Sequence, residues 1–496
     1  MNRRQFLQLA ALAAMGTATN SCARLSPRRV APEPLARPED YLLLTGCSII
    51  DVARGIALKD HALLIRNRRI AAVLPPEAER PAAADRTLDL KGAWVMPGII
   101  NAHCHMSLSG AMGFGPGMIM AFERQLERNA EECVRHGVTT VRDMLSMGVF
   151  LEDLRHKIGR GDVLGPRIQW SSALDVRDGY TDRMLPFFKK TPFWQPVDTP
   201  EEGRLAVRRA ADRGANFIKL FQQPRELLMP GSTIPVMDGT TVRAIQDEAE
   251  RLGKYVAMHH TTLDGLMTGL DAGVPSLEHM ATDKGIPEAA ARRIIDNGHT
   301  IIPTASVAFA LAYPRHGDVN WGKGFSVRIE QERRQSMPAL IEEFCEPELA
   351  GSTLKYHRRL CDPASYESRH LFPWPDPTVM NAAANDGALN TIDLYRAGVT
   401  FGCGNDGGVP LIFPGAMVLE MRLLEEQGMR PADILRMATL NNARLIREED
   451  NLGSVEPGKL ADLVVFRDNP LETVQNAARP EMVFMGGRLV YRREKG

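Results

Sequence analysis

Eight short apolar segments alternate with stretches of helical spacing through the middle of this 496-residue chain. This alternation is typical of a parallel sheet of the α/β class, because parallel strands need long crossover connections that are usually helical. Eight units in a row predict a (β/α)8 TIM barrel, assigned to residues 96–439 with a long insertion at about 305–395. The segments end near His105, Asp143, Ser172, Lys219, His259, His279, Thr304 and Asp406.

A His-x-His pair follows the first apolar segment. Side chains alternate along a strand, so His103 and His105 point to one side while Cys104 points to the other. Neutral imidazole is the commonest metal ligand, so the pair predicts a cation site. The alternative is two structural histidines. Barrel active sites form where strands end, which favours the metal site.

Three later segments end in further metal-ligand types. His259 and His279 each follow a strand-like run, and His260 competes with His259 because adjacent strand residues face opposite ways. Asp406 follows a run rich in glycine, which would let the backbone approach a bound ion or substrate. The alternative for Asp406 is an ordinary turn aspartate.

Lys219 lies inside an apolar segment, where an unpaired ammonium group is costly to bury. One interpretation is a lysine at a strand edge whose amine reaches solvent. The other is a lysine that carbon dioxide has converted into a carbamate. The carbamate is anionic, and its two oxygens can bridge two metal ions.

Together these segments resemble the amidohydrolase superfamily, within the branch of imidazolonepropionase-like enzymes and Xaa-Pro or Xaa-Arg dipeptidases. The resemblance implies two divalent ions, with zinc expected. One ion is held by His103, His105 and Asp406, the other by His259 and His279, and carbamylated Lys219 bridges them. It also favours His259 over His260. The matching segments are 95–105, 137–143, 215–219, 256–259, 277–279, 405–408 and 453–465.

The implied reaction is hydrolysis of an amide bond in a small substrate, with a dipeptide or N-acyl amino acid as the first expectation. A hydroxide between the ions attacks the carbonyl, and Asp406 carries the proton to the leaving nitrogen. Arg177, Tyr180 and Arg183 follow the third segment and are candidates to bind a substrate carboxylate. The alternative for these three is a solvated basic loop.

Two other functions compete with this one. A cyclic-amide or lactone hydrolase remains open, and a deaminase of the superfamily would carry a glutamate after the fifth-strand histidine. Here His260, Thr261 and Thr262 follow His259, and Lys219 is present, which counts against deamination. A non-catalytic scaffold would lack several ligands. The number of bound metal ions separates these cases. We expect about two ions per chain for the binuclear hydrolase, about one for a deaminase and none for a scaffold.

The chain ends have a different pattern. Residues 40–95 and 440–496 contain short alternating strands with turn residues between them. The family resemblance implies that these two pieces form one small β-sandwich. The insertion at 305–395 is either a lid over the site or a set of helices that pack a subunit contact in a homo-oligomer.

The first residues predict export. Arg3 and Arg4 precede a short apolar core in residues 1–22, which resembles a twin-arginine signal peptide for the bacterial periplasm. Residues 23–39 are rich in proline, arginine and alanine, which predicts a tether. Cys22 ends a weak lipoprotein motif, so the mature protein is either anchored by a lipid on Cys22 or free. A formal net charge of −1 gives no basic surplus for nucleic acid.

The cysteines do not form Cys-x-x-Cys pairs, so a thiolate zinc site is not expected. Cys345 and Cys361 are close in the sequence, and an exported protein could join them in a disulfide. Two free cysteines are the alternative.

Overall fold

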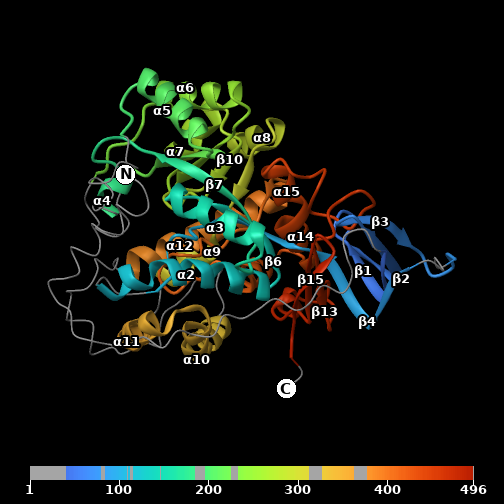
Figure 1. Cartoon of the computed structure of the whole chain (residues 1–496). Helices are drawn as coiled ribbons and strands as arrows, with labels where there is room; N and C mark the ends of the chain where they lie inside the picture. The colour runs from blue at the N-terminus through green and yellow to red at the C-terminus, as the bar shows by residue number, and fades with distance from the viewer. Residues whose placement is uncertain are drawn as a thin grey trace.

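The computed structural model describes residues 41–79, 84–108, 110–111, 116–145, 147–184, 196–224, 233–311, 327–361 and 377–494. It contains an eight-stranded parallel sheet that curls into a barrel, and a separate seven-stranded mixed sheet at one side (Figure 1). The predicted signal peptide and tether, including Cys22, lie outside the described residues. No helix among the described residues is long and apolar enough to cross a membrane.

The barrel strands follow one another in chain order around the sheet. Its two edges are joined by hydrogen bonds from Ala102 N to Cys403 O (3.1 Å) and from Asp406 N to His103 O (2.9 Å). The predicted (β/α)8 barrel is therefore confirmed. The strands are β5 (Ile99–Cys104), β6 (Val138–Asp143), β7 (Arg167–Leu174), β8 (Phe217–Gln222), β9 (Val256–His260), β10 (Ser276–Glu278), β11 (Thr300–Ile302) and β12 (Thr400–Phe401).

Helices cover the outside of the barrel, and several begin at side-chain caps. Thr199 forms a capping box with Glu202 at the start of α5, and Asp238 accepts backbone N–H bonds at the start of α6. Helices α2 to α8 connect successive strands, as the alternating pattern predicts, and α13 to α15 follow the last barrel strand. They are α2 (Pro116–Arg135), α3 (Gly148–Arg160), α4 (Tyr180–Met184), α5 (Pro200–Asp212), α6 (Gly239–Arg251), α7 (Leu263–Ala272), α8 (Glu288–Asp296), α13 (Met417–Glu426), α14 (Pro431–Arg436) and α15 (Asn442–Leu445).

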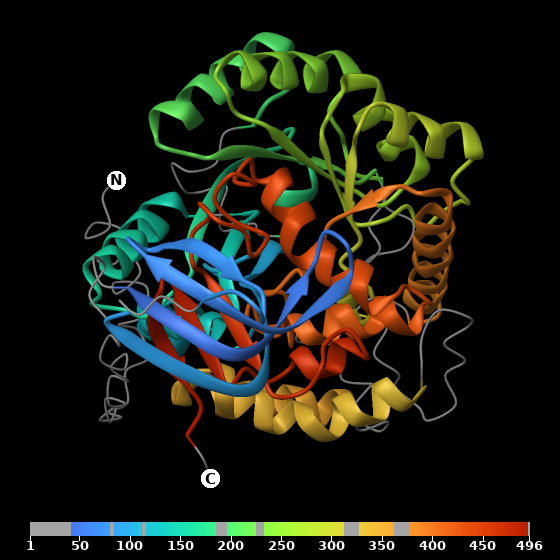
Figure 2. The same cartoon turned by 90° about the vertical axis from the view of Figure 1, so that its right-hand side faces the viewer.

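The small sheet combines strands from both ends of the chain (Figure 2). Its central strand β4 pairs in parallel with β1 and antiparallel with β13, so the two chain ends meet there. Alternate residues such as Leu44, Val95 and Val465 are buried in its core. The predicted unit built from both ends is confirmed. Its strands are β1 (Leu42–Asp51), β2 (Ile56–Arg66), β3 (Arg69–Leu74), β4 (Arg86–Pro97), β13 (Leu463–Phe466), β14 (Met482–Met485) and β15 (Arg488–Arg492).

The long insertion is largely helical where it is described. It contains α9 (Ala305–Leu311), α10 (Val327–Phe344), α11 (Pro347–Cys361) and α12 (Pro377–Ala397). Helices α10 and α11 run alongside α2 (Figure 1). Met337, Ile341 and Phe344 pack there against Leu411 and Phe413, which follow Asp406 in the chain. The described part of the insertion is thus a layer against the barrel and against the loop after Asp406.

Cys345 and Cys361 are not joined by a disulfide in the structure. Cys345 is buried in the cluster between α10 and α2, whereas the Cys361 Sγ atom lies 3.6 Å from Nε2 of His357. The disulfide considered from the sequence is therefore not formed.

Candidate metal centre

The predicted ligands of the first ion come together where β5 ends. Nε2 of His105 lies 2.7 Å from Oδ1 of Asp406, and Nε2 of His103 lies 3.4 Å from the same oxygen. Asp406 reaches this point from the loop after β12, because the barrel closes between that loop and β5. Three donor atoms at this spacing could hold one metal ion.

The other two predicted histidines continue the cluster. The ring centroids of His103 and His279 are 4.8 Å apart, and those of His279 and His259 are 4.3 Å apart. The four histidines therefore form a continuous row across the C-terminal ends of the barrel strands. They lie at the ends of β5 and β9 or directly after β5 and β10, as the positions of their motifs predict.

Lys219 differs from the expectation in one respect. It is the third residue of the six-residue strand β8, not a residue at the strand end. Its side chain is buried, and Nζ has no hydrogen-bond partner among the described residues. Nζ lies 5.5 Å from the ring centroid of Phe221, two residues along the same face of the strand. The interpretation of Lys219 as a strand-edge lysine reaching solvent is therefore wrong.

Hydrogen bonds fix the orientation of three of the histidines. Nδ1 of His103 lies 2.7 Å from Oε2 of Glu278, and Nδ1 of His279 lies 2.6 Å from Oγ1 of Thr304. These partners leave Nε2 of both rings available as a ligand atom. Nε2 of His259 instead lies 2.5 Å from the amide oxygen of Gln223, which leaves Nδ1 available.

Burial keeps His103, His259 and His279 neutral. It lowers the pKa of His103 to about 4 and lowers the pKa values of His259 and His279 well below the ordinary value. Burial alone would raise the pKa of Asp406, but His103 and His105 outweigh it and hold that pKa below the usual range. These three residues therefore present neutral imidazoles and Asp406 an ionised carboxylate, the protonation states that metal binding needs.

Lys219 is also easier to deprotonate than an ordinary lysine. Burial lowers the pKa of its amine to about 8, although the nearby carboxylates of Glu278 and Asp406 oppose this effect. An uncharged amine is the form that reacts with carbon dioxide. The site therefore favours the chemistry that carbamylation requires.

Left-handed backbone conformations gather at this end of the barrel. His279, Thr304 and Asp406 have φ values of 70°, 46° and 54°. Such conformations are uncommon outside glycine, and they are typical of functional sites when the surrounding structure holds them. The left-handed turn at His279 lets both Glu278 and His279 face His103, although neighbouring strand residues normally face opposite ways.

The glycines before and after Asp406 allow close packing against β5. A Cβ atom on Gly404 would lie 2.5 Å from N of His103, and one on Gly408 would lie 2.4 Å from O of His105. These glycines bring the Asp406 loop to the strand that carries the two histidines. Their expected role, approach of the backbone to a bound ion or substrate, stays a prediction beside this observed contact.

Of the three predicted substrate contacts, the structure brings Tyr180 to the cluster. Its ring stacks on His259 with centroids 4.9 Å apart, and on Phe221 with centroids 5.6 Å apart. Arg177 and Arg183 are exposed. Nε of Arg177 lies 3.3 Å from the carboxylate of Asp198.

His260 is fully buried at the end of β9. The register of the sheet pairs His259 with Phe221 and with Glu278, which belong to the inner face, so His260 is directed the other way. The Cβ atom of His260 lies beside Gly265 of α7, which covers the barrel from outside. The geometry therefore agrees with the choice of His259 as the ligand candidate.

Four residues that support the cluster were not predicted. Glu278, Thr304 and Gln223 bind histidine ring nitrogens, and Arg142 binds Glu278. Glu278 and Arg142 belong to segments already singled out by the sequence. Thr304 marks the expected end of the seventh segment, although it was not predicted to bond to a histidine. Gln223 carries no signal that the sequence alone could separate from an ordinary polar residue.

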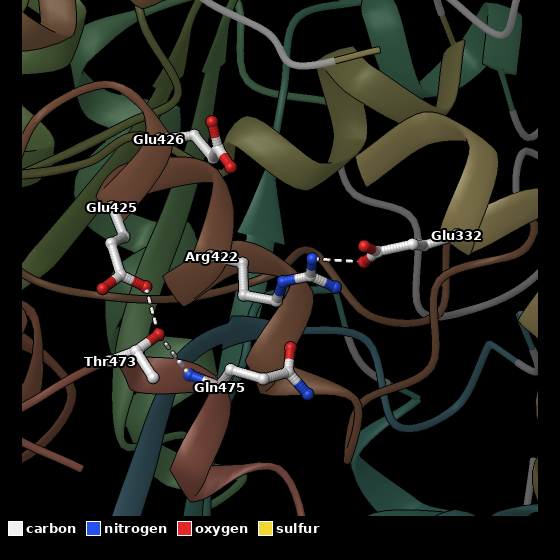
Figure 3. A pocket seen from close by; sticks show the side chains of 6 residues that line it. All are labelled: Glu332, Arg422, Glu425, Glu426, Thr473 and Gln475. Atoms are coloured by element: carbon white, nitrogen blue, oxygen red, sulfur yellow. Dashed lines mark hydrogen bonds and ion pairs between the residues drawn. The ribbon is translucent and has the colours of Figure 1, made fainter. Parts of the chain in front are cut away.

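Two other features lie away from the cluster. A cavity of about 540 Å³ is lined by Glu332, Arg422, Glu425, Glu426, Thr473 and Gln475, and by none of the side chains described above (Figure 3).

A second group of residues of metal-ligand type, Glu132, His136 and Glu343, joins α2 to α10. Nε of Arg135 lies 3.8 Å from Glu132, so this group is part of a charged network between the helices.

The donor set of the barrel site suits divalent ions. Nitrogen and carboxylate oxygen donors are those that zinc prefers, and ligand histidines normally bond through their second nitrogen to a carboxylate, hydroxyl or carbonyl. Nδ1 of His105 and Nζ of Lys219 are buried atoms without hydrogen-bond partners among the described residues. A site with such orphaned atoms fits a bound group.

Comparison with known proteins identifies the family of the chain. The profile of the amidohydrolase family matches residues 94–490. The chain is 24% identical over 471 residues to ochratoxinase of Aspergillus niger, covering 88% of this chain and 84% of that protein. It is 23% identical over 485 residues to imidazolonepropionase of Geobacillus kaustophilus, covering 87% and 90%. A solved Xaa-Pro dipeptidase has the same fold, with a TM-score of 0.70, 22% identity and coverage of 92% and 100%.

Proposed function

The chain belongs to the amidohydrolase family of hydrolases that act on carbon–nitrogen bonds, and on that premise we propose that it cleaves a small amide with two divalent metal ions. The observation that carries the proposal is the row of four histidines with Asp406 at one end and Lys219 buried nearby. Zinc is the proposed metal, because its preferred donors match this set.

The proposed ligands divide into two groups. His103, His105 and Asp406 would hold one ion, and His259 and His279 would hold the other. Lys219, once carbamylated, would supply an anionic ligand to the pair. When bound, the two ions would lower the pKa of a water from 15.7 to about 7 and polarise the scissile carbonyl.

Charge balance supports the carbamate. In the metal-free site two cations, Lys219 and Arg142, lie near two anions, Glu278 and Asp406. Two divalent ions would add four positive charges to this buried volume. Converting the ammonium group of Lys219 into a carbamate replaces one of the cations with an anion, which lowers the repulsion.

Asp406 is the proposed proton carrier. Its low pKa keeps it ionised at neutral pH, so that its carboxylate can accept the proton of the attacking water. The carboxylic acid so formed then donates that proton to the leaving nitrogen, because an amine is a poor leaving group unless it is protonated. Catalysis of this kind contributes roughly 10²- to 10⁴-fold to the rate.

The proposed substrate is a dipeptide or an N-acyl amino acid. Tyr180 stands beside His259 and is the proposed substrate contact, since its ring gives an apolar face and its hydroxyl a polar end. A cyclic amide is the second candidate, favoured by the similarity to imidazolonepropionase over most of both chains.

We also propose export to the periplasm by the twin-arginine route, because Arg3 and Arg4 precede an apolar core.

A substrate screen tests the function. Protein reconstituted with zinc and bicarbonate is incubated with dipeptides, N-acyl amino acids and cyclic amides, and released amine is measured. Activity that a chelator abolishes and added zinc restores supports the proposal. Activity that persists after the bound metal has been removed contradicts it.

A further inference from the structure

Glu278 lies between a proposed metal ligand and a buried cation. Its Oε2 atom is 2.7 Å from Nδ1 of His103, and its Oε1 atom is 2.7 Å from Nη2 of Arg142. All three side chains are at most 1% exposed. The carboxylate thus joins β5, β6 and β10 inside the barrel.

Arg142 holds Glu278 in a fixed place. Its Nε atom donates to the carbonyl of Ala102 (2.5 Å), and its Nη1 atom donates to Oγ of Ser276 (3.0 Å). The hydroxyl of Ser276 donates in turn to Oε1 of Glu278. Each oxygen of the carboxylate therefore has its own donors, so the carboxylate cannot rotate without breaking buried charge-assisted bonds.

The groups that hydrogen-bond to the proposed histidine ligands differ in charge. His103 bonds to a carboxylate, whereas His279 bonds to the hydroxyl of Thr304 and His259 bonds to the amide of Gln223. A carboxylate raises the basicity of an imidazole more than a neutral partner does, and a more basic imidazole binds a metal more tightly.

We propose that Glu278 is a positioning residue which holds Nε2 of His103 toward the metal site, and that it makes the ion bound by His103, His105 and Asp406 the more tightly held of the two. This inference rests on the proposed function, because it presumes two ions. Under this proposal the two ions leave the protein in a fixed order. The ion at His259 and His279 leaves first, and the ion at His103 leaves second.

The test follows metal release from zinc-loaded protein in a chelator, by mass spectrometric metal analysis over time. The wild type should lose its ions in two phases. Glu278→Gln keeps the shape but removes the charge, and it should speed the slow phase by roughly 10- to 100-fold. The matched variant Thr304→Val removes the partner of His279 and should speed the fast phase alone.

A double variant separates positioning from folding. Glu278→Gln leaves the buried guanidinium of Arg142 without the carboxylate of its ion pair, although its bonds to Ala102 and Ser276 remain, so Arg142→Met is combined with it. The double variant should recover the melting temperature of the metal-free wild type but retain the faster release. Slow-phase release at the wild-type rate in both Glu278 variants would overturn the inference. A wild type that binds fewer than two ions would instead overturn the proposed function.

Discussion

Oδ1 of Asp406 lies 2.7 Å from Nε2 of His105, although the two residues stand near opposite ends of the barrel sequence. The contact exists because the loop after β12 bonds to β5 and closes the barrel. One oxygen is thereby placed beside two imidazoles. This placement is the basis for the proposed double task of Asp406, as a metal ligand and as a proton carrier.

Asp406→Asn should fold normally but lose turnover. Asparagine tolerates the left-handed backbone of this position, whereas an amide oxygen cannot carry a proton to the leaving nitrogen. We expect kcat to fall by roughly 10²- to 10⁴-fold in a steady-state assay. Asp238→Asn, which retains a cap for α6, is the control and should keep wild-type kcat. An Asp406→Asn enzyme with wild-type kcat contradicts the assigned role.

The stability of the metal-free protein should depend on pH through Lys219. Burial lowers the pKa of its amine from 10.5 to about 8, so between those values the unfolded chain binds more protons than the folded chain. The free energy of unfolding therefore gains a contribution as pH rises from about 8 to 10.5. Lys219→Met removes the effect.

The free energies of unfolding of the wild type and of Lys219→Met can be compared by denaturant unfolding in metal-free and carbonate-free buffer. The Met variant should be more stable than the wild type below pH 8, by an amount on the order of 3 kcal/mol. The difference should shrink toward pH 10.5. A difference that does not change with pH would mean that Lys219 is not a desolvated cation in the metal-free protein.

His259→Ala and His260→Ala should have opposite effects on metal content and stability. His259 lies in the histidine row, so its loss should reduce bound zinc from about two ions per chain to about one. His260 is buried on the other face, so its truncation should lower the melting temperature and leave the metal count unchanged. The reverse pattern would assign the ligand to His260.

Export should depend on Arg3 and Arg4. Replacing both by lysine should leave the protein in the cytoplasm, because the paired arginines are the predicted recognition feature of the signal. Cell fractionation with antibody detection measures this. The Cys22→Ser variant tests lipid anchoring separately, since it should move a membrane-bound protein into the soluble periplasmic fraction. Full export of the double lysine variant would exclude the twin-arginine route.

The sequence predicted the ligand candidates because each follows a short apolar run, and parallel strand ends converge in a barrel. It did not predict the support of His103 by Glu278. Strict alternation places Glu278 opposite its neighbour His279, and the left-handed turn that breaks the alternation occurs at a histidine, where residue type gives no warning. Lys219 was placed at a strand end because the end of an apolar run does not mark where hydrogen bonding stops.

The substrate contacts were harder to predict for a related reason. Arg177, Tyr180 and Arg183 are close in the sequence, but only their positions around α4 decide which of them faces the site. Asp175 accepts bonds from N and Oγ1 of Thr181 and holds this turn, so that Tyr180 stacks on His259. Such loop geometry depends on long-range packing that composition does not reveal.

A crystal structure of the zinc-loaded protein, with anomalous scattering recorded at the zinc edge, tests the central claim most directly. The account predicts two anomalous peaks roughly 3.5–4 Å apart between the His103 and His259 groups. It also predicts density for a carboxyl group on Nζ of Lys219. A single peak beside an unmodified Lys219 amine, in crystals of active enzyme, would contradict the binuclear site.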